Sequence, residues 1–200
     1  MPYLLDYKLA HRQLTAAGFV SLYHNSGAFG FPPSATVHTI GWTGTSDDTI
    51  RPEMTPMIRR VSEPYGPTMA RLAQHAWSTH LKGDCWLTPK SHWHYEMHYG
   101  NRSLLEEILP LIDVNPASLA DRNDGTPVVF VPTGGAEADA MFEMLLRLLQ
   151  GLISSDFQLT FPARATLCTI HHHEQLWWQT TDAGVVAAID SINPIVGNQT

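Results

Sequence analysis

The chain has 200 residues, enough for one ordinary domain, and 44% of them are hydrophobic, which excludes a disordered or fibrous protein. Its formal net charge of −7 excludes a generic basic nucleic-acid binder, and no apolar run approaches the roughly 18 residues of a membrane span. Charged residues are scarce at 16%, whereas the 11 histidines nearly equal the 12 lysines and arginines combined. We therefore expect one globular domain over residues 1–200 and look for its function among the histidines.

The first third of the chain predicts few regular elements. Apolar residues at helical spacing indicate a helix over 3–17, ended by Gly18, and β-prone residues indicate strands over 19–23 and 37–42. Apart from the second strand, we expect an irregular loop region rich in proline and glycine over about 25–66. Such a long stretch is uncommon in a domain unless it covers a functional surface.

The middle of the chain has clearer periodicity. It predicts a helix over 68–81, a strand over 84–88 and a helix over 104–109, with Ser103 as its N-cap. One further helical turn is expected at 116–120. Between these elements lies an unusual alternating segment, which is considered below.

The last third alternates strands with helices. Strands are predicted over 127–132, 157–161 and 166–178, a long helix over 136–153, and a closing helix over 182–192. This order predicts an α+β (mixed α/β) fold: a single domain with a central, largely antiparallel or mixed sheet and packed helices.

The N-terminal residues and the cysteines predict a cytoplasmic protein. Asp6 interrupts the segment that would be apolar in a secretory signal. Cys85 and Cys168 are too few for a disulfide framework, and their apolar neighbours predict two buried side chains.

Residues 92–99 alternate strictly between two kinds of side chain, which favours a strand over a helix. One face of this strand would carry the aromatic and apolar residues, Trp93, Tyr95, Met97 and Tyr99. The other face would carry the polar residues, His92, His94, Glu96 and His98. Neighbours on one face lie about 6.5–7 Å apart, so two imidazoles there can share one metal ion.

A second histidine cluster lies within the strand predicted over 166–178. His171 and His173 would share one face with Gln175, and His172 and Glu174 would share the other. If the two histidine strands are neighbours, several imidazoles and a carboxylate form one patch on the sheet.

We predict that this patch is a site for Zn²⁺ or another divalent transition metal, because imidazole and carboxylate donors suit such ions. The predicted ligands are His94, Glu96, His98, His171 and His173, and Glu96 is also the predicted catalytic carboxylate. A metal with an open coordination position would polarise water for hydrolysis or support other small-molecule chemistry.

Other interpretations of the same surface stay open. It could be a polar groove that binds a small-molecule ligand or a protein partner without catalysis, and self-assembly into a homo-oligomer is one such case. Clustered imidazoles could also titrate between about pH 5 and 8, or simply cover the wet face of an antiparallel sheet. We expect neither a nucleic acid nor a membrane as partner.

Overall fold

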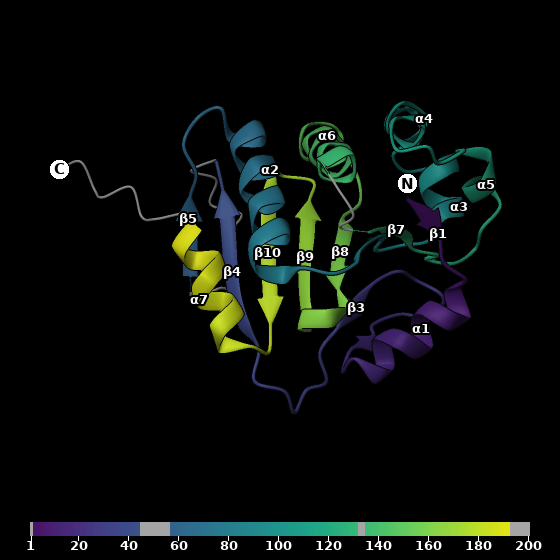
Figure 1. The fold of residues 1–200 in the computed structure, drawn as a ribbon. Helices are drawn as coiled ribbons and strands as arrows, with labels where there is room; N and C mark the ends of the chain where they lie inside the picture. Colours follow the sequence, from purple (N-terminus) through teal and green to yellow (C-terminus); the bar gives the residue numbers. More distant parts are fainter. Residues whose placement is uncertain (1, 45–56, 132–134, 193–200) are drawn as a thin grey trace.

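Eight strands form one mixed sheet in the computed structural model, which describes residues 2–44, 57–131 and 135–192 (Figure 1). Their order across the sheet is β1-β7-β6-β8-β9-β10-β4-β5. Neighbouring strands are antiparallel, except that β4 and β5 are parallel. The strands are β1 (Tyr3–Leu4), β4 (His38–Thr43), β5 (Met57–Arg60), β6 (Cys85–Pro89), β7 (Val128–Phe130), β8 (Phe157–Phe161), β9 (Thr166–His171) and β10 (Gln175–Thr180). A separate small sheet pairs β2 (Val20–Ser21) with β3 (Phe29–Gly30).

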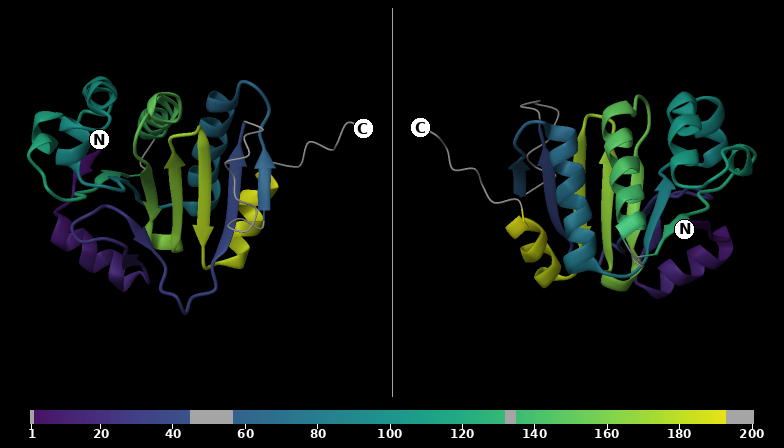
Figure 2. Two further views of the ribbon diagram at one scale, coloured as in Figure 1. Left: turned by 180° about the vertical axis from the view of Figure 1, so that it is seen from behind. Right: turned by 45° about the horizontal axis from the view of Figure 1, so that its top comes forward.

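Seven α-helices pack with the sheet in the described part of the chain, which confirms the predicted α+β class. They are α1 (Tyr7–Ala16), α2 (Tyr65–Ala76), α3 (Trp93–His98), α4 (Arg102–Leu111), α5 (Ala117–Ala120), α6 (Gly135–Gly151) and α7 (Ala183–Ile192). Helices α2, α6 and α7 cover one face of the sheet, and α3, α4 and α5 lie together beyond β8 (Figures 1 and 2). None of the helices that the structure describes is long and apolar enough to cross a membrane.

The two faces of the sheet belong to two hydrophobic cores of different size. Because side chains alternate along a strand, Cys85 and Leu87 of β6 enter the large core beneath the helices. Trp86, between them, packs instead in a smaller core that contains Leu14 of α1 and Val129 of β7. The sheet is therefore covered on both sides near β6 and β7.

Several segments differ from the expectations of the sequence. Part of the region expected to be an irregular loop forms strand β5, which pairs with β4, while residues 45–56 lie outside the described residues. Helix α4 begins after Asn101 rather than after Ser103. The strand predicted over 166–178 is a hairpin, β9–β10, whose turn falls within the histidine cluster.

Candidate metal centres

Residues 93–98 form helix α3, so the strand predicted over 92–99 is wrong. His92 caps this helix, because its Nδ1 accepts the backbone N–H of Tyr95 at 3.1 Å. The side chains that α3 buries are Trp93, Glu96 and Met97, a spacing of three and four residues that is typical of a helix.

Tertiary contacts explain why the alternating pattern does not form a strand. The indole of Trp93 is fully buried and donates from Nε1 to the Thr126 carbonyl at 2.6 Å. Tyr99, which a strand would place on the same face as Trp93, has 74% of its surface exposed. The core therefore takes Trp93 and leaves Tyr99 in solvent, although a strand would place both on one face.

The helix brings two predicted ligands together with a residue that the sequence did not indicate. His94 and His98 lie one turn apart, and their ring centroids are 4.4 Å apart. One ligand atom from each histidine and one from Asp121, at the end of α5, all lie within 4.8 Å of one another. We call these three residues the α3–α5 site.

Backbone hydrogen bonds hold the two sides of the α3–α5 site in register. The His94 N–H donates to the Arg122 carbonyl at 2.8 Å, and the Trp93 N–H donates to the Asp124 carbonyl at 3.2 Å. His94 Nδ1 is 3.1 Å from the carbonyl oxygen of Ala120. Since a carbonyl oxygen can only accept, Nδ1 carries a proton, and in the neutral imidazole Nε2 then keeps its lone pair.

Glu96, the predicted catalytic carboxylate, lies on α3 between the two histidines in sequence but is fully buried. It accepts hydrogen bonds from the Ser91 hydroxyl, from Asn101 Nδ2 at 2.8 Å and from the Ser155 hydroxyl at 2.7 Å. The backbone of Gly100 also approaches closely, since a Cβ there would lie 2.5 Å from Glu96 Oε2. The carboxylate thus joins the start of α3, the start of α4 and the segment before β8.

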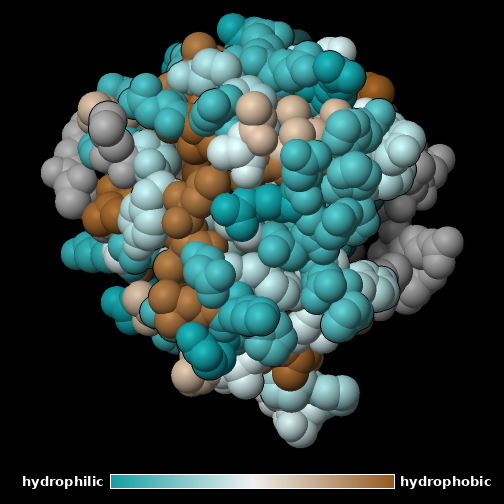
Figure 3. Space-filling model, turned by 90° about the vertical axis from the view of Figure 1, so that its right-hand side faces the viewer, coloured by the Kyte–Doolittle hydropathy of each residue, from teal (hydrophilic) through white to brown (hydrophobic). Residues whose placement is uncertain are grey.

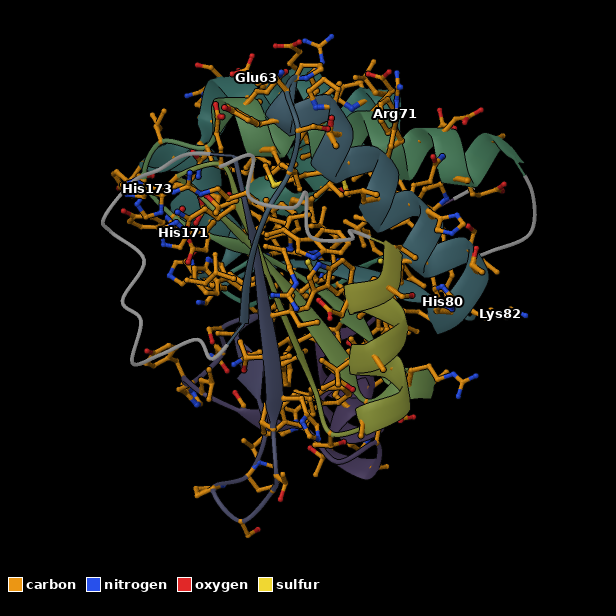
Figure 4. The ribbon with its side chains drawn as sticks, turned by 90° about the vertical axis from the view of Figure 1, so that its left-hand side faces the viewer. Glu63, Arg71, His80, Lys82, His171 and His173 are labelled. Carbon is orange, nitrogen blue, oxygen red and sulfur yellow. The ribbon has the colours of Figure 1, made fainter. Side chains whose placement is uncertain are left out.

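The second histidine cluster lies in the turn of the β9–β10 hairpin. His171 is the last residue of β9 and pairs with Gln175, the first residue of β10. The ring centroids of His171 and His172 are 4.3 Å apart, and those of His172 and His173 are 4.4 Å apart. One ligand atom from each of the three rings lies within 4.8 Å of the other two. We call His171, His172 and His173 the histidine hairpin, and Figure 4 shows two of them together.

Asp156, the residue before β8, supports the histidine hairpin. Its Oδ1 accepts from His172 Nδ1 at 2.9 Å, and its Oδ2 lies 3.5 Å from Lys90 Nζ. Burial raises the pKa of Asp156, but the hydrogen bond from His172 and the positive charges near it outweigh burial and lower the pKa overall. The carboxylate is therefore ionised at neutral pH.

Burial acts on the pKa of His171 in the opposite direction. It lowers the pKa of His171, with the neighbouring imidazoles adding to the effect and Asp156 opposing it. A neutral imidazole is the form that binds metals. His171 Nδ1 accepts the backbone N–H of His173 at 3.2 Å, so this nitrogen is the unprotonated one.

Exposed aromatic side chains adjoin the α3–α5 site. Tyr95 and Tyr99 contact each other with ring centroids 6.2 Å apart, and Tyr99 also lies 6.3 Å from the His94 ring. The right-hand side of the molecule in Figure 1, where α1, α3, α4 and α5 lie, is mostly hydrophilic, with a band of hydrophobic side chains across it (Figure 3). Aromatic and imidazole rings therefore share one accessible surface.

The five predicted ligands do not form a single group among the described residues. The structure brings His94 together with His98, and His171 together with His173, but in two separate groups. Glu96 belongs to neither group. The sequence does not indicate Asp121 or Asp156, because an isolated aspartate carries no local signal of metal binding. His172 is not among the predicted ligands, because a continuous strand would turn it to the face opposite His171 and His173.

The two cysteines take no part in these groups. Both are fully buried, as the sequence predicts, and burial raises the pKa of each thiol well above its usual range.

Comparisons with protein-family models, with curated proteins and with solved structures find no match to this chain. The described residues therefore offer two groups of imidazoles and carboxylates that are close enough to hold a metal, and no relative indicates their use.

Proposed function

We propose that the protein binds a divalent transition metal, with Zn²⁺ as the first choice, at the α3–α5 site. The observation that carries this proposal is the hydrogen bond from His94 Nδ1 to the Ala120 carbonyl. Metal-binding histidines commonly donate their second ring nitrogen to a carbonyl or carboxylate, which fixes both the tautomer and the ring. Here that bond leaves Nε2 available for a metal.

The same short segment supplies both the orienting group and the third ligand. Ala120 orients His94, and Asp121 follows it immediately. Arg122, the next residue, directs Nε to the Ser118 carbonyl and Nη1 to the Thr126 hydroxyl. Two imidazoles and a carboxylate thus face a common point.

Three protein ligands leave coordination positions for water, which is the arrangement of catalytic rather than structural zinc sites. Zinc lowers the pKa of bound water to about 7 and so supplies hydroxide for hydrolysis. We therefore extend the proposal to metal-assisted hydrolysis of a small molecule that reaches this exposed surface. Fe²⁺ and Mn²⁺ suit the same donors and are the next candidates.

Zinc titration of the metal-free chain, purified without a polyhistidine tag, tests the binding step. We expect the His94→Ala/His98→Ala variant to lose one saturable zinc site and to keep its thermal stability. The matched control is His75→Ala/His80→Ala, because these rings form a comparable histidine pair, 6.0 Å apart, that belongs to neither group of candidate ligands. Equal zinc stoichiometry in all three proteins would contradict the proposal.

Hydrolysis is tested on the zinc-loaded protein with p-nitrophenyl carboxylate and phosphate esters as probes. We expect a zinc-dependent rate that the His94→Ala/His98→Ala variant lacks. Zinc binding without any rate above that variant would remove the hydrolytic part of the proposal and leave a non-catalytic metal site.

The exposed tyrosines favour a second candidate function, in which this surface binds a small-molecule ligand or a protein partner without catalysis. Tyrosine supplies contact area at interfaces at low cost in conformational entropy. Self-association is the simplest form of this alternative. Sedimentation velocity of the wild type and of Tyr95→Ala/Tyr99→Ala tests it, and a concentration-independent monomer in both would exclude self-association through this surface.

A further inference from the structure

The histidine hairpin differs from ordinary strand structure because it brings three consecutive side chains to one point. Successive side chains in a strand face opposite ways, so adjacent histidines would not meet there. The turn after His171 breaks this alternation, and Glu174 completes the turn with a positive φ of 56°. The rings of His171 and His173 are consequently only 5.1 Å apart.

Asp156 gives His172 the orientation of a metal ligand. Oδ1 of Asp156 accepts a hydrogen bond from His172 Nδ1 at 2.9 Å and another from the His172 backbone N–H at 3.3 Å. With Nδ1 fixed in this way, Nε2 is the nitrogen with a free lone pair. This carboxylate–imidazole pairing is the usual arrangement behind a metal-binding histidine.

His171, unlike His172, uses a ring nitrogen to accept a backbone hydrogen bond within the turn. Its unprotonated nitrogen, Nδ1, already accepts the His173 backbone N–H at 3.2 Å. A neutral imidazole has one such nitrogen, so a metal bound at either ring nitrogen of His171 leaves Nδ1 unable to accept this amide. Metal binding must therefore release the His173 amide and change the turn.

We propose that the histidine hairpin is a second site for a divalent transition metal, separate from the α3–α5 site, and that loading it rearranges the turn between β9 and β10. Borderline ions such as Zn²⁺ and Cu²⁺ fit a group of imidazole donors. Ligation uses one nitrogen from each imidazole, and Asp156 stays behind His172 as its hydrogen-bond acceptor.

The rearranged turn borders a shallow cavity of about 500 Å³. Glu174 lines this cavity together with Glu63, Tyr65 and Gln150. Because Glu174 is the last residue of the turn, loading the hairpin alters one wall of the cavity. The second site thereby links metal binding to the shape of a surface that a small ligand can enter.

The test uses ¹⁵N-labelled protein in the His94→Ala/His98→Ala background, titrated with Zn²⁺, so that it does not depend on the proposed function of the α3–α5 site. We expect one saturable zinc site and large shifts of the His173 and Glu174 amide resonances. Adding His172→Gln, an exchange at a half-exposed side chain, should abolish both effects while the remaining spectrum stays folded. The matched control in this background is His75→Ala/His80→Ala, which should change neither.

Two results would overturn the proposal. The first is the absence of saturable zinc binding in the His94→Ala/His98→Ala background, or binding that survives His172→Gln. The second is saturable binding at the hairpin with an unchanged His173 amide resonance, which would disprove the rearrangement of the turn.

Discussion

The α3–α5 site and the histidine hairpin assemble their candidate ligands in opposite ways. The first combines two histidines of one helix with Asp121 from another, and backbone hydrogen bonds between the two segments set its geometry. The second takes three consecutive residues from one turn, and the pairing of β9 with β10 sets its geometry. The first site has its His94 nitrogen available in advance, whereas the second must give up a hydrogen bond at His171. Similar donor sets can therefore differ in how much the protein must rearrange.

The largest expected effect is the loss of stability when Glu96 is replaced, and it would show that Glu96 supports the fold and belongs to neither candidate metal site. Glu96→Ala leaves the Ser91, Asn101 and Ser155 donors without their buried acceptor, which should lower the free energy of unfolding by about 3 kcal/mol. Urea unfolding in the presence of a chelator measures this loss. Zinc affinity of the folded fraction should change little, because Glu96 belongs to neither group.

Glu106→Gln is the control for Glu96→Ala, because Glu106 forms an exposed ion pair with Arg102 on the surface of α4. It should change the free energy of unfolding by no more than about 0.5 kcal/mol. A Glu96 variant with normal stability and lost zinc affinity would instead restore the original prediction that Glu96 is a ligand.

The next effect concerns the carboxylate that enters the α3–α5 site directly. Asp121→Asn should weaken zinc binding there by about 100-fold, since even the loss of a group behind a ligand costs about 10–100-fold. The zinc titration that detects this loss is run in a His172→Gln background, so that only one site is observed. Asp139→Asn, which removes an equal charge from an exposed position on α6, should leave the affinity unchanged. Equal losses in the two variants would mean that only net charge matters.

A smaller effect is expected at Asp156, which in the proposed site orients His172 and does not itself bind the metal. Asp156→Asn should weaken zinc binding at the histidine hairpin by about 10-fold, because His172 loses its charged acceptor. Calorimetry in the His94→Ala/His98→Ala background measures it. An affinity equal to that of the unsubstituted hairpin would show that Asp156 does not support this site.

The smallest expected effect is on the thiols. Burial raises the pKa of Cys85 and Cys168, so both stay protonated and shielded at neutral pH. Native protein should therefore resist alkylation by iodoacetamide until it unfolds, as mass spectrometry would show, and zinc binding should be unaffected by the reagent. Rapid labelling that abolishes zinc binding would mean that a cysteine, and not the histidines alone, binds the metal.

The hydrophobic periodicity within each segment of the sequence predicts most of the fold. The strand over residues 157–161 matches β8 in full, and α6 lies within two residues of its predicted bounds, because a buried strand and a long amphipathic helix each show their own periodicity. The segment over 92–99 shows the limit of this signal. A spacing of four residues returns to the same face in a strand and in a helix, so His94 and His98 stay together in both. A spacing of two returns to the same face only in a strand, so Glu96 is buried away from both histidines in α3.

The sequence by itself thus determined the fold class, the burial of both cysteines and the two histidine clusters. The tertiary structure alone decided which ligands meet. Asp121 reaches His94 only because the segment after α5 pairs with the start of α3, and Asp156 reaches His172 only because β8 lies beside β9. The physical reason is that periodicity specifies which face a residue takes within its own element, whereas metal ligation depends on distances between elements, and packing sets those distances.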